Sequence, residues 1–146
     1  MVEFEESVVI NRPVPEVFAF VSDLENDPPW TKSTAVRRTS QGPIGVGTTF
    51  VQEARFLGLR LHLSCVVVGY EADHSMTVEA TAGPLSLDSI RAVEPVGENA
   101  SKVTASGGGR ARGVLRFAER PLAALGAHQL RRQLGRLKQV LEGPTA

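Results

Sequence analysis

Cysteine, histidine and aromatic residues are scarce in this chain of 146 residues, which holds one cysteine, three histidines and 5% aromatics. A single cysteine excludes a disulfide framework, and with three scattered histidines it cannot supply a closed zinc site. The few aromatic side chains argue against a stacking platform for single-stranded nucleic acid. The run Gly107-Gly108-Gly109 lacks the Lys-Ser/Thr pair of a phosphate loop. We therefore expect no metal, no cofactor and no nucleic acid partner.

Long apolar runs are also absent, because no segment approaches the ~20 apolar residues that a membrane span needs. The acidic opening Met-Val-Glu-Phe-Glu-Glu lacks the basic and then apolar pattern of a signal peptide. We expect no integral membrane segment and a cytoplasmic location. The length and the apolar share of 42% fit a single domain over residues 1–146.

The net charge is zero, but the two ends of the chain differ in sign. Residues 1–30 hold seven acidic side chains and one basic one, whereas residues 110–138 hold eight basic side chains and one acidic one. The basic segment either offers a surface to an anionic partner or pairs with the acidic end in space. The sequence pI of about 6.8 favours the second interpretation, because nucleic-acid-binding domains are usually strongly basic.

Glycine and proline punctuate the chain at short intervals, which is typical of short strands joined by turns. A short helix is predicted to begin at Pro15, where the missing N–H of proline costs nothing, and to end before Pro28. Short turns between the later strands indicate antiparallel pairing. The predicted strands are residues 4–10, 35–39, 48–55, 59–70, 76–81, 85–94 and 100–106.

The last third of the chain changes from strand to helix periodicity. The run Gly107-Gly108-Gly109 is predicted to end the sheet and to act as a flexible link. Apolar residues at helical spacing then predict an amphipathic helix over residues 120–142, ended by Gly143-Pro144. Strands followed by one long helix predict an α+β fold, with the helix covering one face of an antiparallel sheet.

Five parts of the sequence together carry a resemblance to a known family. They are Asn11–Phe18, Ser22–Asn26 with Trp30, Ile44–Thr48, Val93–Gly97 with Lys102–Thr104, and Leu134–Glu142. In this order and spacing they resemble the START-like helix-grip superfamily (SRPBCC), specifically its polyketide cyclase/dehydrase and lipid-transfer group.

The resemblance implies a helix-grip fold, in which a seven-stranded antiparallel sheet curves around a long C-terminal helix and two short helices follow the first strand. It also implies a hydrophobic cavity between sheet and helix. Known relatives bind lipids, polyketides, quinones or hormones there, and some catalyse cyclisation or dehydration. The family has no common catalytic motif, so the resemblance implies a pocket rather than a reaction.

Alternation along the strands predicts which side chains face inward. Arg91 is the most informative, because Leu87 and Val93 on the same face are apolar. A buried guanidinium needs a partner, so Arg91 meets a carboxylate, bonds backbone carbonyls, or awaits an anionic or carbonyl-bearing ligand. Two simpler interpretations are that it extends to water or that the register is off by one residue.

The predicted ligand contacts come from the inward strand face, the apolar helix stripe and the mouth of the cavity. Gln129 and Gln133 are placed to bond either a ligand or strand backbone. Gly126, which costs about 1 kcal/mol in a helix, indicates either room for a ligand or a kink. Trp30 either caps the cavity or fills a gap beside the sheet. The predicted set is Trp30, Phe50, Gln52, Leu63, Cys65, Met76, Ser89, Arg91, Leu122, Gly126, Gln129 and Gln133.

No catalytic constellation is visible in the sequence. His62, His74 and His128 are expected outside the cavity, Cys65 is typical of a small buried hydrophobe, and no acid/base carboxylate pair is evident. The predicted function is binding of a small hydrophobic molecule. The alternatives are a polyketide cyclase, aromatase or dehydratase in which Arg91 polarises a carbonyl, and an interaction module that uses the basic helix surface. Whether the chain is an enzyme, and whether it forms a homodimer, stays open.

Overall fold

One antiparallel sheet of seven strands organises the fold, with the strand order β1-β7-β6-β5-β4-β3-β2. The structure is a computed structural model that describes residues 2–31, 35–56, 59–82, 85–111 and 119–143. The elements are β1 (Val2–Ile10), α1 (Val14–Val21), η1 (Leu24–Asn26), α2 (Pro28–Thr31), β2 (Ala35–Arg38), β3 (Thr49–Phe56), β4 (Leu59–Glu71), β5 (Ser75–Ala82), β6 (Leu85–Pro95), β7 (Ser101–Ala111) and α3 (Glu119–Glu142).

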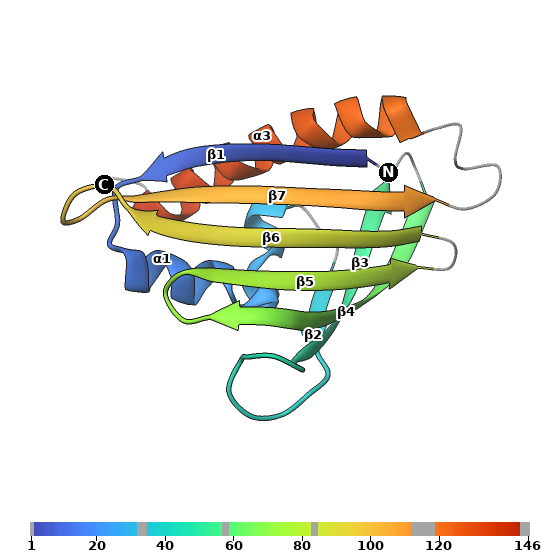
Figure 1. Ribbon diagram of the computed structural model, residues 1–146, viewed down its shortest axis with the longest axis horizontal. Coiled ribbons are helices and arrows are strands. Elements are labelled where there is room, and N and C mark those ends of the chain that lie inside the picture. The colour runs from blue at the N-terminus through green and yellow to red at the C-terminus, as the bar shows by residue number, and fades with distance from the viewer. Residues whose placement is uncertain (1, 32–34, 57–58, 83–84, 112–118, 144–146) are drawn as a thin grey trace.

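The helices lie on one side of the sheet. Figure 1 shows β1, β7, β6 and β5 side by side in front, and β4, β3 and β2 turning away from them. It also shows α1 and the red part of α3 behind the sheet, whereas the orange part of α3 lies beside the edge of β1. This arrangement confirms the predicted α+β helix-grip fold, with short helices after the first strand. None of the described helices is long and apolar enough to cross a membrane.

Proline positions explain the short helices between β1 and β2. Pro15 lies in the first turn of α1, where no N–H is needed. Pro28 was expected only to end a helix, but it also begins α2, for the same reason. Asp23 stabilises the start of η1 by accepting a hydrogen bond from the backbone N–H of Glu25 at 3.0 Å. The chain therefore changes direction between α1 and η1 and again between η1 and α2, before it rejoins the sheet at β2.

The prediction that Gly107-Gly108-Gly109 ends the sheet is wrong. β7 continues through all three glycines to Ala111. On one side they pair with Ser89, Asp88 and Leu87 of β6, and on the other side with β1. Strand pairing on both edges holds the backbone extended, although glycine alone has little preference for a strand. The run is part of the sheet and not a flexible link.

The C-terminal helix α3 confirms the predicted amphipathic helix. Leu134 and Leu137 from its apolar stripe are buried in the core, and α3 meets the sheet mainly at β1. It ends at Gly143, whose φ of 74° is readily adopted by glycine and whose N–H bonds the carbonyl of Gln139 at 3.0 Å. Arg131 on α3 donates to Glu6 on β1 at 2.9 Å, so the basic and acidic ends of the chain do meet there.

Two clusters of buried side chains form the core. The first joins α1, α2, β1, β6, β7 and α3, and the second lies over β3, β4 and β5 with η1. The first contains Ile10, Val17, Phe18, Val21, Trp30, Val93, Val103, Ala105, Leu134 and Leu137. The second contains Leu24, Phe50, Leu63, Cys65, Val67, Met76 and Val78.

Candidate functional site

Arg91 lies on the inward face of β6 and reaches the segment between η1 and α2. Its Nη1 and Nη2 atoms donate to the two carboxylate oxygens of Asp27 at 2.8 and 2.7 Å. Nη1 also donates to the backbone carbonyl of Val21, at the end of α1, at 2.9 Å. The Asp27 side chain is 1% exposed and the Arg91 side chain is 14% exposed. Of the partners proposed from the sequence, Arg91 therefore has both a carboxylate and a backbone carbonyl.

Trp30, on α2, packs against the Asp27–Arg91 pair. The guanidinium carbon of Arg91 lies 4.8 Å from the centroid of the indole ring, within the range of a cation–π contact. Trp30 is 2% exposed, which fits the interpretation that it fills the gap beside the sheet. Its indole Nε1 is buried and has no hydrogen-bond partner in the described part of the chain. Its backbone carbonyl accepts a hydrogen bond from Nε of Arg136 on α3 at 2.9 Å.

The electrostatics of the pair follow from its burial. Burial raises the pKa of Asp27, and the charge and hydrogen bonds of Arg91 oppose that rise. Burial alone would lower the pKa of Arg91, but the charge and hydrogen bonds of Asp27 outweigh it, and the pKa of Arg91 is raised. The guanidinium is thus a permanent cation, whereas the carboxylate depends on that cation to stay charged.

The concave face of the sheet divides into a closed half and an open half. In the closed half, Val93 on β6 and Met76 on β5 are fully covered by the core. Further along the same two strands the inward side chains become small or half-buried. Together with the half-buried inward positions beside them on β3 and β7, we call these positions the open half: Gln52, Ala80, Ala82, Leu87, Ser89 and Gly107.

Strand register brings the small inward residues of the open half next to one another. Ser89 pairs with Val78 on one side and with Gly107 on the other. Ala80 pairs with Cys65 and Leu87. Small side chains on adjacent strands leave space above the sheet that larger ones would fill. Arg91 is the next inward residue after Ser89, so the ion pair stands at the border between the two halves.

The predicted site residues fall into four groups. Phe50, Leu63, Cys65, Met76 and Trp30 are buried in the core clusters, whereas Gln52, Ser89 and Arg91 are half-buried on the same face. Gln133 donates to the carbonyl of Thr31 at 3.3 Å, so it supports α2, and Gln129 is exposed. The side chains at Leu122 and Gly126 lie outside the part of α3 that the structure describes. Their contacts with a ligand stay a prediction.

Asp27 is the site residue that sequence reasoning missed, because its place before two prolines was interpreted only as a helix end. One signal was available: an inward Arg91 needs a carboxylate, and the first thirty residues are rich in acids. Alternation alone could not choose among them, since Asp27 is distant from β6 in sequence and not on a strand.

Cys65 is expected to react slowly with thiol reagents. Burial first, and then the charge of Asp27, raise the pKa of its thiol to about 11. A rise of two units over the ordinary value of 9.0 lowers the thiolate fraction about 100-fold at pH 8. We expect a disulfide reagent to modify the native protein at least about 100-fold more slowly than the urea-unfolded chain. Equal rates would contradict the buried position.

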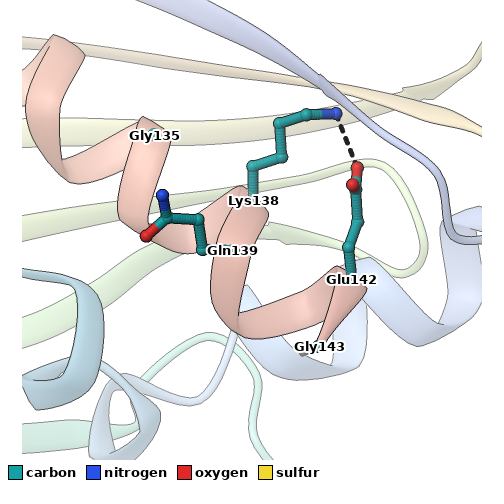
Figure 2. A pocket seen from close by; sticks show the side chains of 5 residues that line it. All are labelled: Gly135, Lys138, Gln139, Glu142 and Gly143. Atoms are coloured by element: carbon teal, nitrogen blue, oxygen red, sulfur yellow. Dashed lines mark hydrogen bonds and ion pairs between the residues drawn. The ribbon is translucent and has the colours of Figure 1, made fainter. Parts of the chain in front are cut away.

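A separate open groove of about 530 Å³ lies at the C-terminal end of α3. Figure 2 shows its lining, which consists of Gly135, Lys138, Gln139, Glu142 and Gly143. Lys138 donates to Glu142 at 2.6 Å and to the carbonyl of Val9 at 2.7 Å. The charges of this groove thus have partners within the protein, and it is not the predicted cavity between sheet and helix.

Comparison with known proteins gives a family and a fold. The sequence profile of the family described as "Polyketide cyclase / dehydrase and lipid transport" matches residues 1–142. No curated protein matches the chain in sequence.

Three solved structures illustrate the likeness in fold. The Zhui aromatase/cyclase from Streptomyces sp. R1128 matches with a TM-score of 0.80 and 12% identity, over 96% of this chain and 93% of that one. A protein from Thermus thermophilus matches with a TM-score of 0.81 and 15% identity, over 99% of both chains. A START superfamily protein from Mycobacterium smegmatis matches with a TM-score of 0.77 and 10% identity, over 96% of this chain and 99% of that one. At these identities the likeness concerns the fold alone.

Proposed function

The chain belongs to the polyketide cyclase/dehydrase and lipid transport family, and from this premise we propose that it binds one small, mostly apolar molecule in the open half of the concave face. The observation that carries the proposal is the change along β5 and β6 from fully buried to half-buried inward side chains. A folded protein normally fills such positions with large apolar residues. Here Ala80, Ser89 and Gly107 are small and only half-buried, so a ligand that packs on them would bury apolar surface.

The composition of the open half fits an apolar ligand with few polar groups. Ala80, Ala82 and Leu87 offer apolar contact, and Gln52 and Ser89 are polar residues on the same face. A mainly apolar lining with a few placed polar groups is typical of ligand pockets. Lipids and polyketides, the ligand classes that the family description suggests, have this character.

Among the described residues, the positions of the histidines and of Asp27 favour binding over the enzymatic alternative. His62, His74 and His128 are all exposed. The Asp27 carboxylate is buried and bonded to Arg91, so it cannot reach a substrate as a general base. A cyclase, aromatase or dehydratase needs a group that takes or delivers a proton. The enzymatic alternative therefore stays a prediction, tested by turnover of poly-β-ketone analogues.

Filling the open half is expected to block binding. Ser89→Phe places a large ring between Val78 and Gly107, whereas Ile90→Phe changes the next residue, which is exposed on the opposite face. In titrations with the neutral probe N-phenyl-1-naphthylamine, followed by its fluorescence, we expect saturable 1:1 binding to the unchanged protein. Ser89→Phe should weaken it at least about tenfold, which corresponds to ~1.4 kcal/mol.

The Ile90→Phe variant is the matched control and should bind the probe like the unchanged protein. Non-saturable binding to the unchanged protein would speak against a defined site. Equal affinities of the two phenylalanine variants would place the probe elsewhere on the molecule.

A further inference from the structure

We propose that the ligand carries a neutral carbonyl group, whose oxygen accepts hydrogen bonds from Nε and Nη2 of Arg91. This inference rests on the proposed function, because it assigns the polar end of the molecule held in the open half. It follows from three features of the Asp27–Arg91 pair: the donors that remain on the guanidinium, the net charge of the pair, and its place at the border of the open half.

The donors of Arg91 are only partly used. A guanidinium has five N–H groups. Within the described part of the chain, Nη1 donates to Asp27 and Val21, and Nη2 donates once to Asp27. The Nε–H and the second N–H of Nη2 remain, and in a planar guanidinium these two point to the same side. Asp27 and Val21 thus fix the orientation of a two-donor fork before any ligand arrives.

The net charge of the pair selects a neutral acceptor over an anion. Asp27 already balances the charge of Arg91, and the carboxylate is 1% exposed. A second carboxylate on the free fork would leave one negative charge in excess in a place with little water, which is costly. A ketone, ester or amide oxygen satisfies the same donors and leaves the site neutral. The fork therefore favours a carbonyl over a carboxylate.

A second unpartnered donor lies against the fork, and the fork stands next to the open half along β6. The buried Nε1 of Trp30, in the ring against which Arg91 packs, is a further donor with no partner in the described part of the chain. Ser89 follows Arg91 on the inward face of β6, toward the open half. The charges of Arg91 and Asp27 also shift the pKa of Cys65, which pairs with Ala80 of the open half. A ligand that lies in the open half can therefore place its polar group beside Arg91.

The test compares three naphthalene probes that differ only in one group: 2-acetylnaphthalene with a carbonyl, 2-isopropylnaphthalene with none, and 2-naphthoate with a carboxylate. Their affinities are measured by isothermal titration for the unchanged protein and for the double variant Asp27→Leu/Arg91→Met. The double variant replaces the ion pair by apolar side chains of similar size, a change that buried ion pairs often tolerate. Arg91→Lys is the second variant, because it keeps the cation but lacks the planar fork.

The decisive quantity is the ratio of the two dissociation constants, isopropyl over acetyl, because it cancels the general attraction of the ring for the site. We expect this ratio to fall about tenfold from the unchanged protein to either variant, as for hydrogen bonds to a charged donor. The naphthoate should bind the unchanged protein more weakly than the ketone. A ratio that stays the same in both variants, or a preference for naphthoate, overturns the inference while the binding function stands. Failure of all three probes to bind the unchanged protein overturns the proposed function and this inference with it.

Discussion

Replacing Asp27 by leucine is expected to lower the free energy of unfolding by about 3–5 kcal/mol. The change leaves the guanidinium of Arg91, which is 14% exposed, with one backbone carbonyl as its remaining hydrogen-bond partner. Arginine cannot lose its proton to escape this cost. Among the described residues, Asp27→Leu also removes the only ion pair that links β6 to the segment between η1 and α2. Urea unfolding monitored by the fluorescence of Trp30 measures the effect.

Two further variants separate the buried charge from a general effect of substitution. Glu94→Leu removes the partner of Lys102 in an exposed ion pair and should cost less than about 1 kcal/mol. Asp27→Leu/Arg91→Met should recover most of the stability lost in Asp27→Leu, because no unpaired charge remains. A cost below about 1 kcal/mol for Asp27→Leu would contradict the buried pair.

The opposite single variant, Arg91→Met, is expected to depend on pH. Burial raises the pKa of Asp27, and in this variant no cation opposes the rise. An acid whose pKa is higher in the folded state favours folding when protonated, so its contribution is present at low pH and is lost as pH rises through that pKa. Unfolding measured across acid to neutral pH should show falling stability in Arg91→Met relative to the unchanged protein.

Replacing Leu137 by alanine is expected to lower the free energy of unfolding by about 2–5 kcal/mol. Leu137 is 0% exposed and belongs to the cluster that joins α3 to the sheet. The variant loses the transfer free energy of the removed carbons and leaves a cavity that α3 and β1 can only partly close. The measurement is again urea unfolding, followed by circular dichroism.

The matched control for this prediction lies one turn away on the same helix. Val140 is 40% exposed, so Val140→Ala should change the stability by less than about 0.5 kcal/mol. If the two variants cost the same, α3 is not fixed to the sheet through its apolar stripe, and the described packing of the helix is wrong.

The order of elements could be predicted from the sequence because each depends on local chemistry. Pro15 and Gly143 mark helix ends through properties of single residues. Alternation along residues 59–70 fixes which side of β4 is buried. The glycines of β7 were mispredicted because their strand conformation comes from β1 and β6, and no local rule reports such partners.

The site could be predicted only in part, for the same reason. The inward direction of Arg91 followed from the apolar character of Leu87 and Val93 on its strand. Its partner Asp27 is 64 positions away in the chain, on a turn without periodicity. The helix glutamines share helical spacing with the apolar stripe, but small rotations of α3 decide whether each faces a ligand, the α2 backbone or water. Gln133 and Gln129 illustrate the last two outcomes.

The pairing of β1 with β7 has a consequence for synthesis on the ribosome. Ile10 lies opposite Ser101, and Val2 lies opposite Gly109, so the partner of β1 is made only after the five other strands. Contacts of such sequence separation slow folding. Until β7 emerges, β1 and β6 each present an unpaired edge, the kind of surface on which incomplete chains aggregate. A nascent chain halted before β7 should thus need a chaperone, whereas one extended past it can close the sheet by itself.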